Sequence, residues 1–307
     1  MDRSGRDYMT ELNYNSNTLV SLKLANTFRT MMEKLIAGCP VLEDFALILP
    51  DDERHKAMPS LRVRSQTLKS FLFAFEFNTT GKAFAVEIDA PALKCMTFSD
   101  SQSDKIVLKN LNSLSMVDIN SDFHLKYGKT LGPRKRNVIR DFLIGISSVR
   151  HMIISKLTLE VLFRYSKLGR KFPKFDNLTR LEATLSRSML ELFPSFLESF
   201  PNLKNLILVL SDLREAKEIK LSHVPQCMLL NLESVEINLQ YGEIKRVIIM
   251  EETVKELVRY FLENSVVLIK KLILCFEDLS KANQDSDIFK ELLKFTKLYP
   301  RCQIIIH

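Results

Sequence analysis

The sequence predicts an α/β protein built as a solenoid, with one curved parallel sheet and with helices and irregular segments on its convex side. Three observations predict this class: a short apolar motif that recurs along the chain, helical patterns between several of its copies, and enough apolar residues for a large core. The chain has 307 residues, of which 46% are hydrophobic and 26% charged. This composition is ordinary for a globular protein.

The recurring motif is clearest at Leu203, Leu206 and Leu208. Leu206 and Leu208 alternate as in a half-buried strand, because successive side chains point to opposite faces. Leu203 lies three residues before Leu206, where a chain turning into the strand can still place a side chain in the same core. Ten copies occur, and their first residues are Leu19, Leu42, Leu68, Leu93, Leu114, Val149, Leu178, Leu203, Leu232 and Ile269.

Neighbouring copies of the motif begin 21 to 37 residues apart. A repeat of this kind is typical of a solenoid, and about 20–29 residues is the period of leucine-rich repeats. We therefore expect a leucine-rich-repeat solenoid in which each copy supplies one strand. Strands joined by helices or irregular returns pair in parallel.

The first third of the chain predicts strands with few helices. Residues 1–17 carry no periodic pattern, and we expect a frayed lead-in there. A helix is predicted after the first strand, and it ends near Gly38 because Pro40 forbids its continuation. Residues 51–59 are charged and are expected to form a loop. From Leu61 onward, alternating apolar residues predict strands, with extended segments or short turns on the convex side.

Helices are predicted later in the chain from apolar residues that fall on one helical face. Their expected ranges are 138–146, 189–200, 251–264 and 288–299. Acidic residues at the start of the third of these favour its N-terminus through the helix dipole. Residues 302–307 predict a final strand, which closes the open edge of the sheet.

The basic residues are concentrated in one region. Between Lys126 and Lys174 the chain has 13 Lys and Arg against two acids, whereas its net charge is +7, so the remainder is acidic. The basic residues flank the strand predicted at Val149, and loops on one edge of a sheet are neighbours. We expect them to merge into one patch that meets an acidic partner, the alternative being a solvated surface kept basic for solubility. The residues of this patch expected to bind a partner are Arg134, Lys135, Arg136, Arg164, Arg170 and Lys171.

Residues that lie between the core leucines of the motif face the concave side of the sheet. Lys23, Thr97, Glu182 and Glu236 occupy such positions. Three others are apolar, namely Leu72, Ile153 and Ile207, and we expect them to be exposed and to contact a protein partner. The alternative is that neighbouring side chains cover them.

The sequence predicts no catalytic, cofactor-binding or metal-binding residue. Gly128-Lys129-Thr130 suggests a phosphate loop, but Phe123 stands where that motif needs a glycine, and Pro133 follows closely. The five histidines have no spacing typical of a metal site. We therefore expect a protein without enzymatic activity and without a cofactor.

The five cysteines are dispersed, with no C-x-x-C pair. Such a set indicates reduced thiols in an intracellular protein, located in the cytoplasm or nucleus. The first residues are polar and carry no secretory signal, and no run approaches the roughly 18 apolar residues of a membrane span. No contact with a membrane is expected.

Several segments resemble a plant protein family. Residues 224–237, from Val224-Pro225 to Ile237, resemble the start of the plant FBD domain, as do 256–264 and the closing 302–305. Residues 18–24, 38–44 and 89–94 resemble the leucine-rich repeats of the same F-box/FBD/leucine-rich-repeat family. The resemblance covers nearly the whole chain. It implies a repeat region at 18–223 and an FBD domain at 224–307 that continues and caps the solenoid.

The family resemblance also implies a function. In such proteins an N-terminal F-box docks on a cullin-based ubiquitin ligase, and the repeats present a target. This sequence begins close to its first repeat, and the string Leu49-Pro50-Asp51-Asp52 lies between repeats, so we expect no F-box in this chain and no ligase adaptor bound by it alone. The expected function is non-enzymatic target recognition linked to such ligases.

Two alternatives remain open at this stage. The first is binding of nucleic acid or another polyanion through the basic region 126–174, although few aromatic residues lie among its charges for bases to stack on. The second is a decayed family member without function.

Overall fold

The structure is a computed structural model of the chain. It describes residues 19–25, 32–49, 60–75, 84–125, 130–211, 220–221, 223–239, 247–265, 269–276, 294–295 and 297–306. The predicted lead-in at 1–17, the loop at 51–59 and most of the helix at 288–299 lie outside these ranges, as do Lys126 and Lys129.

A large sheet of eleven parallel strands runs through the described chain. Ten of its strands begin two residues after the first residue of a motif copy, and the eleventh is the predicted final strand. The prediction of an α/β protein with a large parallel sheet is therefore confirmed. The strands in order across the sheet are β1 (Ser21–Ala25), β2 (Asp44–Leu49), β4 (Ser70–Phe75), β6 (Cys95–Asp100), β8 (Met116–Asn120), β9 (His151–Ile154), β10 (Arg180–Leu185), β11 (Asn205–Leu210), β12 (Ser234–Leu239), β13 (Lys271–Phe276) and β14 (Gln303–Ile306).

A second parallel sheet is formed by β3 (Ser60–Arg64), β5 (Phe84–Asp89) and β7 (Ser103–Lys109). These strands are return segments between strands of the large sheet, so extended segments are present there as predicted. On the central strand, the carboxylate of Glu87 accepts hydrogen bonds from Arg64 at 3.0 Å and Lys109 at 3.1 Å. These two bonds lower the pKa of Glu87.

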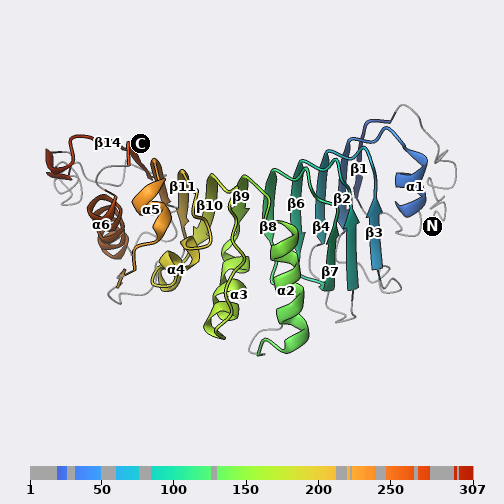
Figure 1. Cartoon of the computed structure of the whole chain (residues 1–307), viewed down its shortest axis with the longest axis horizontal. Helices are drawn as coiled ribbons and strands as arrows, with labels where there is room; N and C mark the ends of the chain where they lie inside the picture. Colours follow the sequence, from blue (N-terminus) through green and yellow to red (C-terminus); the bar gives the residue numbers. More distant parts are fainter. Residues whose placement is uncertain are drawn as a thin grey trace, which may run out of the picture.

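The helices lie along the returns between strands. Figure 1 shows the strands following one another along the molecule, with α2, α3 and α4 on one side of the sheet. The helices are α1 (Met32–Gly38), α2 (Pro133–Gly145), α3 (Lys156–Lys167), α4 (Phe193–Leu197), α5 (Gln226–Leu230) and α6 (Val247–Asn264), with a short 3₁₀ turn at Arg187–Met189.

The helix predictions need three corrections. The helix expected at 251–264 begins at Val247, so the acidic residues expected at its start do not lie in its first turn. The helix expected at 189–200 is wrong, because the chain forms the 3₁₀ turn and then the five-residue α4. Pro194 lies near the start of α4, where its missing N–H is tolerated, but it cannot lie within a longer helix. The sequence reading also missed α3. Ser155 is the N-cap of α3, and its Oγ accepts a hydrogen bond from the amide of Thr158 at 3.2 Å.

The core lies between the large sheet and the return segments. In most strands buried and half-buried residues alternate, as in β4, where Phe71 and Phe73 are buried on one face. A line of phenylalanines crosses the strands on this face, with ring centroids 5.6 Å apart for Phe45 and Phe71 and for Phe73 and Phe98. Phe142 of α2 continues it, 5.5 Å from Phe98. Burial of such a side chain contributes about 1.5–3 kcal/mol.

Polar contacts fix the C-terminal helix α6 to the chain before it. Arg187 is buried, donates a hydrogen bond to Thr253 Oγ1 and forms an ion pair with Glu256 at 3.6 Å. The hydroxyl of Tyr260 donates to the carbonyl oxygen of His223 at 2.5 Å. These contacts join α6 to Arg187 and to His223, which lie before it in the sequence, and so they fix its position against that part of the chain.

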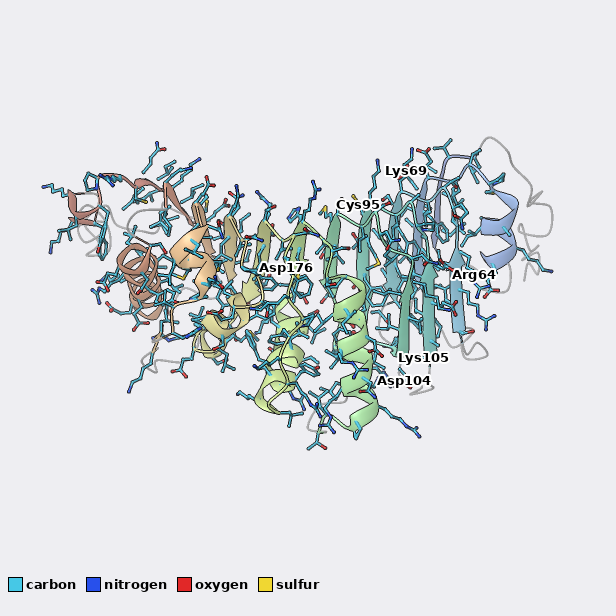
Figure 2. All side chains as sticks on the ribbon, in the orientation of Figure 1. Arg64, Lys69, Cys95, Asp104, Lys105 and Asp176 are labelled. Atoms are coloured by element: carbon cyan, nitrogen blue, oxygen red, sulfur yellow. The ribbon has the colours of Figure 1, made fainter. Side chains whose placement is uncertain are left out.

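The five cysteines all have free thiols, as the sequence predicted. Burial raises the pKa of the Cys227 thiol to about 12, which suppresses the reactive thiolate. Cys95 is exposed near the edge of the sheet where its strand begins (Figure 2). No helix in the described ranges is long and apolar enough to cross a membrane.

Phe73 lies within the line of phenylalanines, so the stability of the fold should depend on its side chain. Phe73 is fully buried, and replacing it by alanine leaves a cavity where three aromatic neighbours lose a contact. We expect Phe73→Ala to lower the free energy of unfolding by about 3–5 kcal/mol, measured by urea denaturation.

Leu298→Ala is the control for this prediction. Leu298 is 68% exposed, so its replacement should change stability by no more than about 0.5 kcal/mol. A Phe73→Ala protein as stable as Leu298→Ala would contradict the packing described for this core.

Candidate functional site

One face of the large sheet is left open by the helices and carries side chains aligned in rows. Parallel pairing places one residue of each strand beside one residue of the next. We call the set that runs through the middle of the strands the central row. It consists of Lys23, Ala46, Leu72, Thr97, Asp118, Ile153, Glu182, Ile207, Glu236, Ile273 and Ile305.

Acidic and aliphatic residues alternate along the second half of the central row. Asp118, Glu182 and Glu236 are separated from one another by Ile153 and Ile207. Because neighbouring strands lie about 4.8 Å apart, successive carboxylates are roughly 10 Å apart. Within the described ranges, none of the three carboxylates forms an ion pair with a Lys or Arg side chain. The second half of the central row therefore carries three carboxylates that are not ion-paired with Lys or Arg in the described chain, although Arg180 and Lys271 lie on the same face two residues earlier on their strands.

Partial burial changes the acid–base behaviour of this face. It raises the pKa of Asp118, and the neighbouring carboxylate of Glu182 raises it further. Burial also lowers the pKa of His151, as does the guanidinium of Arg180, while Asp118 acts in the opposite direction. The Nε2 atom of His151 is buried and has no hydrogen-bond partner among the residues that the structure describes.

Glu236 is held by a neighbour on its own strand. Its carboxylate accepts a hydrogen bond from Asn238 Nδ2 at 3.0 Å. The other polar atom of that side chain, Asn238 Oδ1, is buried and unpaired within the described chain. The open face thus offers carboxylates and acceptor oxygens, and these are groups that cationic side chains satisfy.

The three apolar residues predicted on this face differ in exposure. Leu72 and Ile153 are half-buried and accessible. Ile207 is only 6% exposed, so the expectation that it is an exposed contact residue is wrong. It stands between Glu182 and Glu236 on the adjacent strands, and in-register side chains about 4.8 Å apart cover one another with their aliphatic stems.

The predicted basic patch is brought together only in part. Arg136 and Arg170 line one small hollow between α2 and the end of α3. Lys135 forms instead an ion pair with Asp104 of β7 at 2.8 Å, and Asp104 is labelled in Figure 2. Arg134 and Lys171 are exposed and do not line that hollow.

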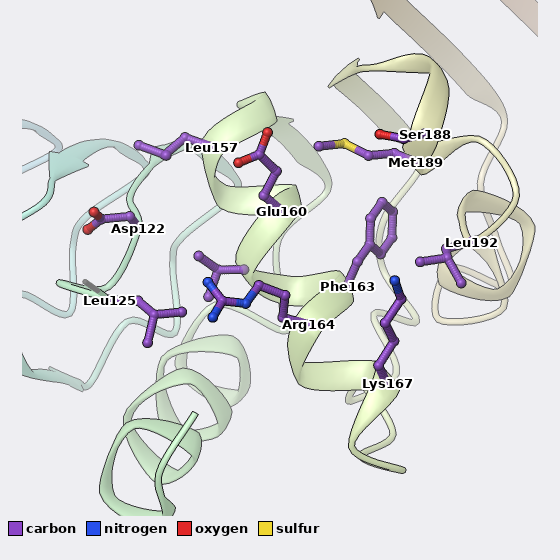
Figure 3. A pocket seen from close by; sticks show the side chains of 11 residues that line it. Asp122, Leu125, Leu157, Glu160, Phe163, Arg164, Lys167, Ser188, Met189 and Leu192 are labelled. Atoms are coloured by element: carbon purple, nitrogen blue, oxygen red, sulfur yellow. The ribbon is translucent and has the colours of Figure 1, made fainter. Parts of the chain in front are cut away.

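Arg164 lies in a different place, on the wall of a larger hollow of about 640 Å³. Figure 3 shows it on α3 with Glu160 and Lys167, opposite Met189 and Leu192. A volume of this size is within the range of ligand pockets, about 300–1,000 Å³. Its lining mixes apolar side chains with charges of both signs, and this arrangement defines no particular chemistry.

Sequence reasoning missed the acidic part of the central row. It named Glu182 and Glu236 as concave positions but omitted Asp118 and Ile273, so their alternation was not seen. The signal was present, because Asp118 and Glu182 are each the fifth residue of a motif copy. Aligning the ten copies on their first residue gives the row directly.

Comparisons with known proteins give one consistent result. Residues 220–274 match the FBD family. The Arabidopsis thaliana F-box/FBD/LRR-repeat protein At2g26030 is 52% identical over 98% of this chain and 73% of its own length. F-box/FBD/LRR-repeat protein At5g44980 from the same plant is 44% identical over 97% of this chain and 72% of its own length. No solved structure matches the chain.

The pKa of His151 can be used to test which charged side chains lie near it on the open face. Arg180 opposes protonation of the imidazole and Asp118 favours it. Removal of the guanidinium in Arg180→Ala should therefore raise the pKa of His151, and Asp118→Asn should lower it, in an NMR titration of the imidazole protons.

Lys271→Ala is the matched control for this titration. Lys271 lies in the same row as Arg180 but three strands away, beyond the Debye length of about 8 Å at physiological salt. Its removal should leave the pKa of His151 unchanged. An unchanged pKa in Arg180→Ala would show that Arg180 does not act on His151.

Proposed function

The chain belongs to the F-box/FBD/LRR-repeat family, and we propose that it is a non-enzymatic interaction module that recognises a target protein through the open face of its large sheet. The family membership supports a role in protein recognition, since the relatives are named for leucine-rich repeats and an FBD and residues 220–274 match the FBD family. The composition of the central row supports the choice of face.

We further propose that the large sheet is a leucine-rich-repeat solenoid at 18–223, continued and capped by an FBD region at 224–307. The coincidence of ten motif copies with ten successive strands supports the solenoid. The parallel pairing of β11 with β12, and then with β13 and β14, supports a cap that extends the same sheet.

The observation that carries the proposed function is the alternation in the central row. Asp118, Glu182 and Glu236 present carboxylates that lack cationic partners in the described ranges, with Ile153 accessible among them. Such a surface complements a target segment in which Lys or Arg residues alternate with aliphatic ones. Charge complementarity of this kind selects partners and accelerates association.

Selection from a displayed library of random peptides tests this proposal. Peptides that bind the wild-type chain should carry a net positive charge. Their binding should weaken as salt is raised from about 50 to 500 mM, because the Debye length falls below about 10 Å within this range and the charges are screened. A triple variant, Asp118→Asn with Glu182→Gln and Glu236→Gln, should bind them at least tenfold more weakly, because it keeps the shape and removes the charge.

The matched control removes three carboxylates elsewhere on the protein. Glu160, Glu191 and Glu263 are exposed on other elements, and their simultaneous replacement by glutamine changes the net charge equally. This control should bind the selected peptides as the wild type does. Equal losses in both triple variants, or selection of acidic peptides, would refute recognition by the central row.

We propose in addition that the family link to a cullin-based ubiquitin ligase requires an F-box joined to this chain. The relatives are named for an F-box as well as for the FBD and the repeats. The 307-residue chain should not retain a purified ligase adaptor, whereas a fusion with the F-box of a relative at its N-terminus should. Both should bind the selected peptides equally, and retention of the adaptor by the chain alone would overturn this part.

A further inference from the structure

A small hollow between α2 and the end of α3 brings three arginines together. It is lined by Pro133, Arg136, Asn137, Arg140, Tyr165 and Arg170, and its volume is about 80 Å³. We call it the arginine hollow. A water molecule in the liquid takes up about 30 Å³, so the hollow has room for one tetrahedral oxyanion but not for a drug-sized ligand.

Two structural features build this hollow. On α2, the residues that line it are spaced three and four apart, so they share one helical face. On the other side, α3 ends at Lys167, and Gly169 adopts a φ of +72°, a conformation that favours glycine and reverses the chain. This turn brings Arg170 towards α2, which lies beside α3 in Figure 1.

The charges of the hollow are not balanced. None of the described residues that line it carries a carboxylate. Arg140 is bound to Asp141, with distances of 3.0 Å from Nε and 2.9 Å from Nη2 to Oδ1. Arg136 Nε is buried without a partner in the described chain, and Arg170 is exposed with no ion pair there. A buried N–H group without an acceptor is destabilising, because it has lost its hydrogen bonds to water, and a bound anion would supply the missing acceptor.

The first turn of α2 adds to the positive potential. This turn contains no acidic residue, and the N-cap Gly132 supplies no side-chain hydrogen bond. The N-terminus of a helix carries a partial positive charge that acidic side chains or anions normally neutralise. Here Arg134, Lys135 and Arg136 occupy that turn instead. Among the described residues, Asp104 neutralises Lys135, and Arg134 and Arg136 have no carboxylate partner, which leaves the turn open to an anion from another molecule.

The geometry favours a single phosphate over a nucleic acid. A nucleic acid is bound through several phosphates at once and, when single-stranded, through exposed aromatic rings. Tyr165 is only 3% exposed, Lys135 is neutralised by Asp104, and Arg164 faces the other hollow. Arg136, Arg140 and Arg170 therefore form one compact site, and the other basic residues of this region do not line it.

Apolar side chains beside the hollow favour a phosphate carried by a protein. Ile144, one helical turn beyond Arg140, is 54% exposed, and Leu168, between Tyr165 and Arg170, is 49% exposed. These side chains can contact residues that flank a phosphorylated one. A phosphate monoester carries a charge of about −1.5 to −2 at neutral pH, which matches two guanidinium groups that bind bidentately.

We propose that the arginine hollow binds the phosphate of a phosphorylated serine or threonine in a target protein, with Arg136 and Arg170 as its principal contacts. The proposal rests on the proposed function only in that the phosphate is carried by a protein. The hollow lies on the helical side of the sheet, away from the central row, so each site can be tested without the other.

The test uses two degenerate peptide pools that differ only in a central phosphoserine or phosphothreonine in place of serine or threonine. Fluorescence polarisation with the full chain should show the phosphorylated pool binding at least tenfold tighter than the other pool. Arg136→Gln with Arg170→Gln should abolish this difference. Arg134→Gln with Lys174→Gln makes the same charge change at exposed positions outside the hollow and should preserve it.

Further arms separate the alternatives. Arg170→Glu changes an exposed residue and should fold normally. It should also abolish the tighter binding of the phosphorylated pool, which tests the proposal even if the Arg136 variant is unstable. The Asp118, Glu182 and Glu236 triple variant should keep the phosphate-dependent difference, which distinguishes this site from the central row. The proposal is overturned if the two pools bind equally, if both double variants lose the difference alike, or if a single-stranded oligonucleotide binds more tightly than the phosphorylated pool through the same arginines.

Discussion

From β1 to β13, each strand of the large sheet is held in step with the next one across the sheet by a backbone carbonyl that accepts two hydrogen bonds. The carbonyl oxygen of Val20 accepts from the amides of Glu43 and Asp44 at 2.8 and 3.0 Å, and that of Glu43 accepts from the amides of Lys69 and Ser70 at 2.7 and 2.9 Å. Because main-chain groups make these bonds, the return segments can vary in length while the strands stay aligned. The same paired bonds recur at the carbonyls of Lys69, Lys94, Ser115, Arg150, Thr179, Lys204 and Glu233.

This register determines both faces of the sheet at once. A shift of one residue would move every side chain of a strand to the opposite face, taking Phe73 out of the core and placing Leu72 in it. The buried phenylalanines and the central row are therefore two consequences of one set of main-chain bonds. It follows that substitutions on the open face can change its chemistry without altering the fold, since the bonds that align the strands involve no side chain.

The sequence predicted the strands well because their signal is local. Leu203, Leu206 and Leu208 lie within six residues, and the same spacing recurs at ten of the eleven strands of the large sheet. The helical returns carry weaker local signals, so α3 was missed and the helix at 189–200 was placed where Pro194 does not allow it. The burial of Ile207 and the arginine hollow depend on neighbours from other elements, and no single stretch of sequence contains that information.

Two surfaces of opposite charge result, and the core keeps them apart. The carboxylates of the central row face one side of the sheet, whereas Arg136 and Arg170 lie among the helices on the other. Layers of secondary structure pack about 10 Å apart, and the Debye length at physiological salt is about 8 Å, so neither surface neutralises the other through solvent. A net charge of +7 therefore describes neither surface, and each selects its ligand by its own local charge.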